Sequence, residues 1–190
     1  SYWFPTWLLG HFPDERIILA SYEASFAASW GRRVRDSLDE AKAAGFFRHG
    51  VRRDVSSVSE WQVEGHAGGM FTAGVGGGVT GKGGNVILDD PVKNAEEAAS
   101  FVYREKAWEW WNSTMYTRLE PGAWALVIQT RWHADDLTGR LLAGSSEPWL
   151  VVNFPAIAEE EDVLGRQVGE ALWPERYPVA ALETIRQQLG

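Results

Sequence analysis

Two adjacent carboxylates, Asp89 and Asp90, end the apolar run 86–88 and stand directly before Pro91. A short apolar run that ends in acids and a proline predicts a buried strand meeting a loop at its carboxyl end. Carboxylates placed there can divide the work of phosphoryl transfer, because one holds Mg²⁺ while its neighbour orients the attacking water. The pattern is typical of a Walker B element. The alternative is a turn in which the acids and the proline only begin a helix.

A second apolar run, 123–129, ends in Thr130 and Arg131. A hydroxyl and a cation at a neighbouring strand end are what a γ-phosphate sensor requires, because the bond to the phosphate is lost on hydrolysis. The alternative is structural. Thr130 then caps the loop, and Arg131 pairs with Asp135 or Asp136.

The glycine-rich segment 76–82 fits the pattern G-x-x-x-x-G-K of a phosphate-binding loop, but its context is wrong. Gly83 follows Lys82, where such a loop needs Ser or Thr for Mg²⁺. The lysine also leads into a strand, so no helix N-terminus is available to hold phosphates. We therefore do not interpret the segment as a phosphate-binding loop. Lys82 remains a cation that can reach a phosphate on a neighbouring subunit.

The elements that must position these residues alternate between strands and helices. Period-two patterns and apolar runs predict strands at 16–21, 59–64, 70–73, 85–89, 123–129 and 149–153. Helical spacing predicts helices at 23–47, 94–116, 135–142 and 178–189. Strands separated by helices predict an α/β fold with a mainly parallel sheet and ligands at the carboxyl ends of its strands.

The predicted helix 94–116 follows directly on the two acids. Asn94 and Glu97 have the spacing of a capping box, which marks its N-terminus. Its expected inward residues are Ala98, Phe101, Val102, Ala107, Trp108 and Trp111.

Composition excludes several classes of protein. With 45% hydrophobic residues in 190, the chain can form a core, and most of its eleven tryptophans are expected in it or half-buried. A net charge of −8 argues against a stand-alone nucleic-acid clamp. The absence of cysteine excludes disulfides and thiol catalysis. The four histidines show no metal-binding spacing, so the sequence predicts no zinc site. The arginines at 32, 33 and 35 are interpreted as a solvated helix face.

Five segments, taken together, resemble the large terminase subunits of tailed phages and prophages. They are 16–22, 31–36, 75–83, 88–94 and 130–137, and they occur in the order found in that family. The two most specific read LDDPVKN and TRWHADDL. The resemblance covers nearly the whole chain and implies a P-loop NTPase fold of the RecA/ASCE-like type.

The resemblance also implies a role for each candidate residue. Asp89 matches the magnesium carboxylate and Asp90 the acid that activates water. Thr130 matches the motif that couples hydrolysis to movement, and Arg131 beside it is a second candidate for contact with the nucleotide. Lys82 stands where relatives have an arginine that acts across the subunit boundary, and it keeps the charge but not the planar fork of arginine.

The family implies ATP and Mg²⁺ as cofactors, in the cytoplasm of a bacterial host and without a membrane. The implied partners are double-stranded viral DNA, the portal protein, the small terminase subunit and other large subunits in a ring. Residues 1–133 are expected to form a partial ATPase core, and residues 134–190 a lid segment that approaches a nuclease domain. We expect the phosphate-binding loop to lie just ahead of Ser1, so that this chain alone binds ATP weakly or not at all.

Other interpretations remain open from sequence. The chain is alternatively an inactive prophage remnant that binds a partner subunit through its sheet edge or its tryptophan-rich helices. A helicase of the same broad fold would carry further arginine motifs after the 123–129 strand. A tryptophan-rich carbohydrate-binding module would need its tryptophans exposed on one face.

Overall fold

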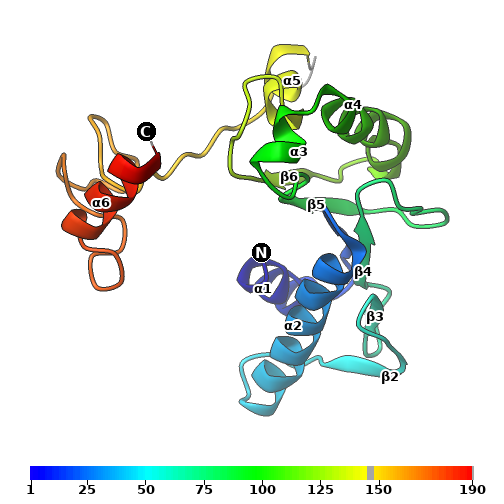
Figure 1. Ribbon diagram of the computed structural model, residues 1–190. Coiled ribbons are helices and arrows are strands. Elements are labelled where there is room, and N and C mark those ends of the chain that lie inside the picture. The colour runs from blue at the N-terminus through cyan, green and yellow to red at the C-terminus, as the bar shows by residue number, and fades with distance from the viewer. Residues whose placement is uncertain (145–147, 190) are drawn as a thin grey trace. The chain divides into compact units, whose positions relative to one another are not determined.

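The computed structural model describes residues 1–144 and 148–189, and in them one six-stranded sheet has the order β2-β3-β4-β1-β5-β6 (Figure 1). The strands are β1 (Arg16–Ser21), β2 (Val51–Ser56), β3 (Glu60–Val63), β4 (Gly69–Gly74), β5 (Asn85–Asp89) and β6 (Ala125–Ile128). Strands β4, β1, β5 and β6 are parallel, whereas β2 and β3 add an antiparallel end. The α/β class is confirmed, but the sheet is mixed. The reason is that only residues 64–68 join β3 to β4, which allows a hairpin and not a crossover.

Helices flank this sheet. They are α1 (Trp3–His11), α2 (Ala24–Ala43), α3 (Ala95–Ala99), α4 (Phe101–Trp110), α5 (Leu137–Gly144) and α6 (Val179–Leu189). Helix α2 packs against α1 and against strands β1 and β4. Figure 1 shows α3, α4 and α5 together at the β5–β6 end of the sheet.

The centre of the sheet is covered on both faces. In β1 every residue after Arg16 is buried, and so are all five residues of β5. Alternate side chains such as Ile17, Leu19 and Ile87 join a core with α1 and α2. Strands buried on both faces are expected to be continuous apolar runs, which is why the sequence located these two accurately.

Helix α2 approaches the sheet closely at Gly31. The indole N–H of Trp61, on β3, donates to the Gly31 carbonyl at 3.1 Å. A β-carbon at Gly31 would lie 2.4 Å from the Val58 carbonyl oxygen and 2.8 Å from Cγ2 of Thr72. The close packing of α2 on the sheet therefore requires glycine at position 31.

Gly31→Ala is expected to destabilise the chain by about 1–3 kcal/mol, because overpacking outweighs the gain of about 1 kcal/mol in helix propensity. Urea unfolding followed by circular dichroism measures the change. Gly144→Ala is the matched control, since nothing lies within 4 Å of its added β-carbon. Equal effects of the two substitutions would contradict the close approach.

The predicted helix 94–116 is interrupted. Ser100 has extended backbone, φ −75° and ψ 120°, and separates α3 from α4, which continues into a π-helical turn at Trp111–Met115 and a 3-10 turn at Tyr116–Arg118. The expected N-cap is confirmed, because the Glu97 N–H donates to Asn94 Oδ1 at 2.9 Å. Phe101 and Val102 were expected inward, and that prediction was wrong: the break at Ser100 turns both into solvent.

Tryptophan burial follows expectation for most of the chain. Seven of the eleven are buried or half-buried, and the exposed ones are Trp3, Trp7, Trp132 and Trp173.

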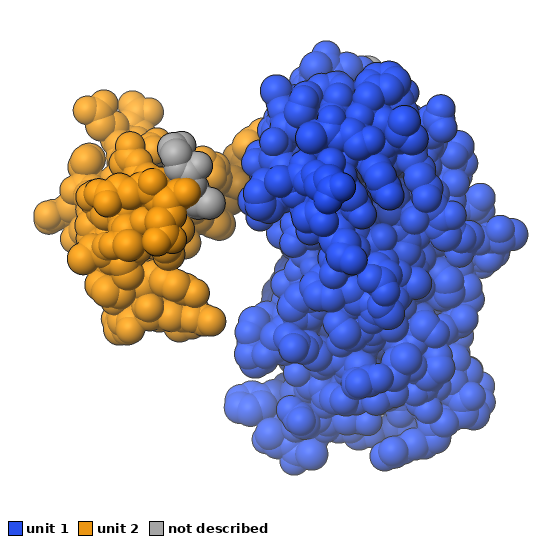
Figure 2. Space-filling model, in the orientation of Figure 1, with its two compact units in different colours: residues 1–145 blue, residues 146–190 orange. Residues whose placement is uncertain are grey.

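Contacts divide the chain into two compact units, Ser1–Ser145 and Ser146–Gly190 (Figure 2). In the second unit α6 confirms the predicted C-terminal helix. The strand predicted at 149–153 is absent from this described segment: residues 148–155 are irregular, and most of their side chains are exposed, so no neighbouring strand pairs with them. The boundary expected between residues 133 and 134 was drawn between an ATPase core and a lid segment, which is a division by function and not by contacts. It stays a prediction. Across the described residues, no helix is long and apolar enough to span a bilayer.

Candidate functional site

The parallel strands end together at one edge of the sheet. In their registers Ser21 lies opposite both Gly74 and Asp89, and Asp89 lies opposite Ile128. Loops that leave the carboxyl ends of parallel strands form the usual ligand-binding edge of an α/β sheet. Both acids predicted from the sequence, and the loop that carries Thr130, lie at this edge.

Asp89 is the last residue of β5 and is only 5% exposed. The Ser1 hydroxyl donates a short hydrogen bond to its Oδ1. Burial raises the pKa of Asp89, and the hydrogen bond from Ser1 opposes that shift. Helix α1 begins two residues after Ser1, so its N-terminus also lies near this carboxylate. A hydroxyl and a carboxylate are hard oxygen ligands of the kind that Mg²⁺ takes.

Asp90 is held in the left-handed backbone region, with φ 45°. Its N–H donates to the Ile128 carbonyl at 2.8 Å, and its carbonyl accepts from the Tyr22 N–H at 3.0 Å, so the backbone is tied to both neighbouring strands. Its Oδ1 accepts from the Thr130 N–H at 3.2 Å. Non-glycine residues rarely adopt this conformation, and its cost is typical of functional sites.

Thr130 and Arg131 differ in what they contact. Thr130 is exposed and is connected to Asp90 through its backbone. Arg131 donates from Nε to Asp136 Oδ2 at 2.6 Å, and Asp136 is only 4% exposed. The structural alternative considered for Arg131 is therefore present in the structure, and its role as a nucleotide contact stays a prediction.

Arg131→Met is expected to destabilise the chain by about 1–3 kcal/mol, because the buried carboxylate of Asp136 would lose its cation. Denaturant unfolding measures this. Arg32→Met, at an exposed position of α2, is the control and should change little. If Arg131→Met leaves stability unchanged and weakens nucleotide binding instead, the ion pair is not the main role of this arginine.

A network of ion pairs connects the helices that follow β5 and β6. Arg104, buried in α4, donates to the carbonyls of Ala98 and Ala99 at 2.7 and 2.9 Å and to Asp135 at 3.3 Å. Arg140 of α5 holds Asp135 at 2.8 Å, and this contact with Arg140 lowers the pKa of Asp135 to about 2. Asp135 thus connects α4, which follows β5, with α5, which follows β6, through its bonds to Arg104 and Arg140.

Lys82 lies away from the two acids. It precedes β5 by three residues and so lies at the amino end of that strand. Asp89 is at the carboxyl end, and the strand between the two ends is about 13 Å long at 3.3 Å per residue. Its Nζ contacts Glu60 at 2.5 Å and lies 5.0 Å from the ring centre of Phe71. Within one chain Lys82 is therefore not part of the cluster, and a role across a subunit boundary stays a prediction. Strand β5, not a helix, follows this lysine, as predicted.

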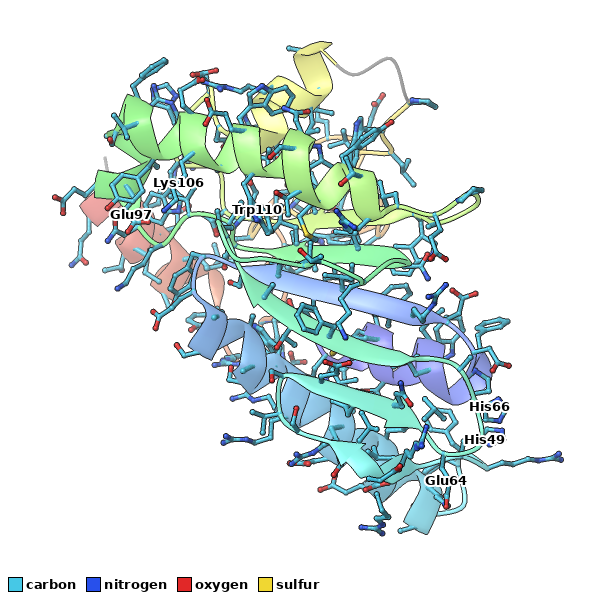
Figure 3. All side chains as sticks on the ribbon, turned by 90° about the vertical axis from the view of Figure 1, so that its right-hand side faces the viewer. His49, Glu64, His66, Glu97, Lys106 and Trp110 are labelled. Atoms are coloured by element: carbon cyan, nitrogen blue, oxygen red, sulfur yellow. The ribbon has the colours of Figure 1, made fainter. Side chains whose placement is uncertain are left out.

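The glycine segment that follows β4 rests on α4. The Trp110 indole N–H donates to the Gly77 carbonyl at 2.9 Å, and a β-carbon at Gly76 would lie 3.1 Å from Cε of Lys106. Figure 3 shows Lys106 and Trp110 on α4. The sequence offered no signal for this contact, nor for those of Ser1 with Asp89 and of Arg104 with Asp135, because each joins segments far apart in the chain.

A family model described as the N-terminal region of the T4-like-virus type of terminase large subunit matches residues 1–189. No curated protein matches the sequence.

Proposed function

Given that the chain belongs to the family of T4-like terminase large subunits, as part of their N-terminal region, we propose that it hydrolyses ATP to drive phage DNA packaging. The observation that carries the proposal is the pair of acids at the carboxyl end of β5. Asp89 is buried and accepts a hydrogen bond from the Ser1 hydroxyl, just before α1. Asp90 accepts one from the Thr130 N–H, just after β6. We further propose that the fold is of the P-loop NTPase type.

Asp89 and the Ser1 hydroxyl would hold the magnesium ion. Bound there, Mg²⁺ would neutralise charge on the phosphate oxygens of ATP. In the first turn of α1 the N–H groups of Trp3 and Phe4 have no partner further back in that helix, and a helix N-terminus favours an anion.

Asp90 would orient and deprotonate the attacking water. Its backbone is fixed by β1 and β6, and one carboxylate oxygen is occupied by the Thr130 N–H. The other oxygen has no partner among the described residues and is available to a water. Fixing a general base in this way lowers the reorganisation needed at the moment of reaction.

Coupling to movement would run through the loop after β6. A shift of Asp90 on hydrolysis would reach Thr130 directly, and the adjacent pair Arg131–Asp136 would carry it to α5. The Arg104–Asp135 contact would pass it to α4.

The partners we propose are double-stranded viral DNA, the portal protein, the small terminase subunit and further large subunits in a ring, in the cytoplasm of a bacterial host. The family supports a packaging complex with DNA and other phage proteins.

Calorimetric titration of ATP with and without Mg²⁺ into the complete subunit that contains this region tests the proposal. We expect Mg²⁺-dependent binding that Asp89→Ala weakens at least about tenfold, the effect of losing about 1.4 kcal/mol of binding free energy. Asp54→Ala, an exposed acid on β2, is the control. Binding that ignores both Mg²⁺ and Asp89 would overturn the proposal, and no binding by the complete subunit would favour the inactive remnant.

A further inference from the structure

A second cluster of titratable side chains lies at the opposite edge of the sheet. His49 precedes β2, His66 lies in the turn between β3 and β4, and Asp14 precedes β1. Figure 3 shows His49 and His66 beside each other. Their sequence separation is 17 residues, so no local spacing indicated that they would meet.

The two imidazoles face each other through ring nitrogens. His66 Nε2 lies 3.1 Å from His49 Nδ1, and the rings are nearly perpendicular, at 79°. Zinc–imidazole bonds are about 2.0–2.1 Å long, so two nitrogens bound to one ion at the tetrahedral angle of about 109° stand about 3.3–3.4 Å apart. The observed separation is only slightly shorter, so a small rotation of the two side chains would bring both nitrogens to one ion.

The other nitrogen of His66 has an orienting partner. Its Nδ1 lies 3.2 Å from both carboxylate oxygens of Asp14. The Ala67 N–H donates to Asp14 at 3.0 Å, and this bond, with the one from His66, lowers the pKa of Asp14. When the Asp14 carboxylate accepts the Nδ1–H, His66 Nε2 carries the ring's lone pair, which faces His49 Nδ1 in this structure and would turn to the ion on binding. Metal-binding histidines commonly have such an orienting partner.

We propose that His49 and His66 chelate a divalent transition ion of the zinc type, with Asp14 as the positioning residue. The described part of the chain holds no ready-made group of three or more His, Asp or Glu ligands, so water completes the coordination. Glu64, also labelled in Figure 3, is paired with Lys42 at 2.6 Å and is not counted as a ligand.

Binding there would connect three segments: the loop before β1, the connection from α2 to β2 and the β3–β4 turn. Because an ion that binds only the folded state stabilises it by mass action, Zn²⁺ should raise the unfolding temperature of the chain. This inference is independent of ATP hydrolysis.

Calorimetric titration of Zn²⁺ into the 190-residue chain tests the site. One ion per chain is expected, with affinity at least tenfold lower in His49→Ala and in His66→Ala, and 10–100-fold lower in Asp14→Asn, as is typical of such orienting partners. His11→Ala, an exposed histidine on α1, is the control.

Thermal unfolding with and without Zn²⁺ is the second readout, and circular dichroism confirms that each variant is folded. The proposal is overturned if Zn²⁺ does not bind, or if the variants of His49 and His66 bind it as the unaltered chain does. The contact between the rings would then be an N–H···N hydrogen bond alone.

Discussion

Replacement of Asp90 by asparagine should lower ATP turnover by the complete subunit about 10²–10⁴-fold, the usual contribution of a general base. Binding of Mg·ATP should persist, because Asp89 and Ser1 are untouched. Asparagine keeps an oxygen for the Thr130 N–H and tolerates the left-handed backbone, so the variant should fold normally. Steady-state phosphate release and calorimetric binding measure the two quantities separately.

Asp54→Asn is the matched control for this substitution, because Asp54 is an exposed acid on β2 whose ion-pair partner is Arg52. Unchanged turnover in Asp90→Asn would mean that another group activates the water. Loss of nucleotide binding as well as turnover would instead assign Asp90 to the metal.

Trp61→Ala should destabilise the first unit by about 3–5 kcal/mol, the range measured for large aromatic side chains in cores. Trp61 is 1% exposed and packs with the core that α1 and α2 form on the sheet. Its removal leaves a cavity and also deprives the Gly31 carbonyl of its donor. Urea unfolding monitored by far-ultraviolet circular dichroism gives the change in free energy.

Trp3→Ala is the contrasting substitution, since Trp3 is 70% exposed and alanine favours a helix. Its effect should stay within about 1 kcal/mol. Similar effects at the two positions would show that the core does not depend on Trp61 in particular.

The sequence predicted five of the six strands of the sheet, and the one that it missed is an exposed edge strand. Strand β1 has the predicted bounds, because an uninterrupted apolar run has few alternatives to a buried strand. Strand β2, Val51–Ser56, was missed because it is an edge strand whose Arg-Arg-Asp centre is exposed. The run 149–153 has the composition of a strand, but composition cannot show whether a partner strand exists.

Helix α1 was missed for a different reason. Its residues are apolar on all sides, so the sequence shows no polar face and no helical period. The break at Ser100 had no proline or glycine to mark it. Both features depend on tertiary contacts, which local patterns do not contain.

Part of the candidate site was predictable. Asp89, Asp90 and Thr130 lie together because parallel strands bring their carboxyl ends to one edge, which strand prediction alone implies. The partners of these residues were not predictable: Ser1 reaches Asp89 across 88 residues. The position of Lys82 could be judged only from the path of the chain between β4 and β5.

The backbone of Asp90 also bears on how this position can evolve. A left-handed conformation costs most side chains roughly 1–2 kcal/mol, and aspartate, asparagine and glycine tolerate it best. A glutamate there would keep the negative charge but would adopt the left-handed conformation less readily. A glycine would adopt that conformation easily but would lose the charge. Descendants of this gene thus have almost no neutral path away from aspartate, and homologues that carry asparagine or glycine here should be those that have abandoned hydrolysis.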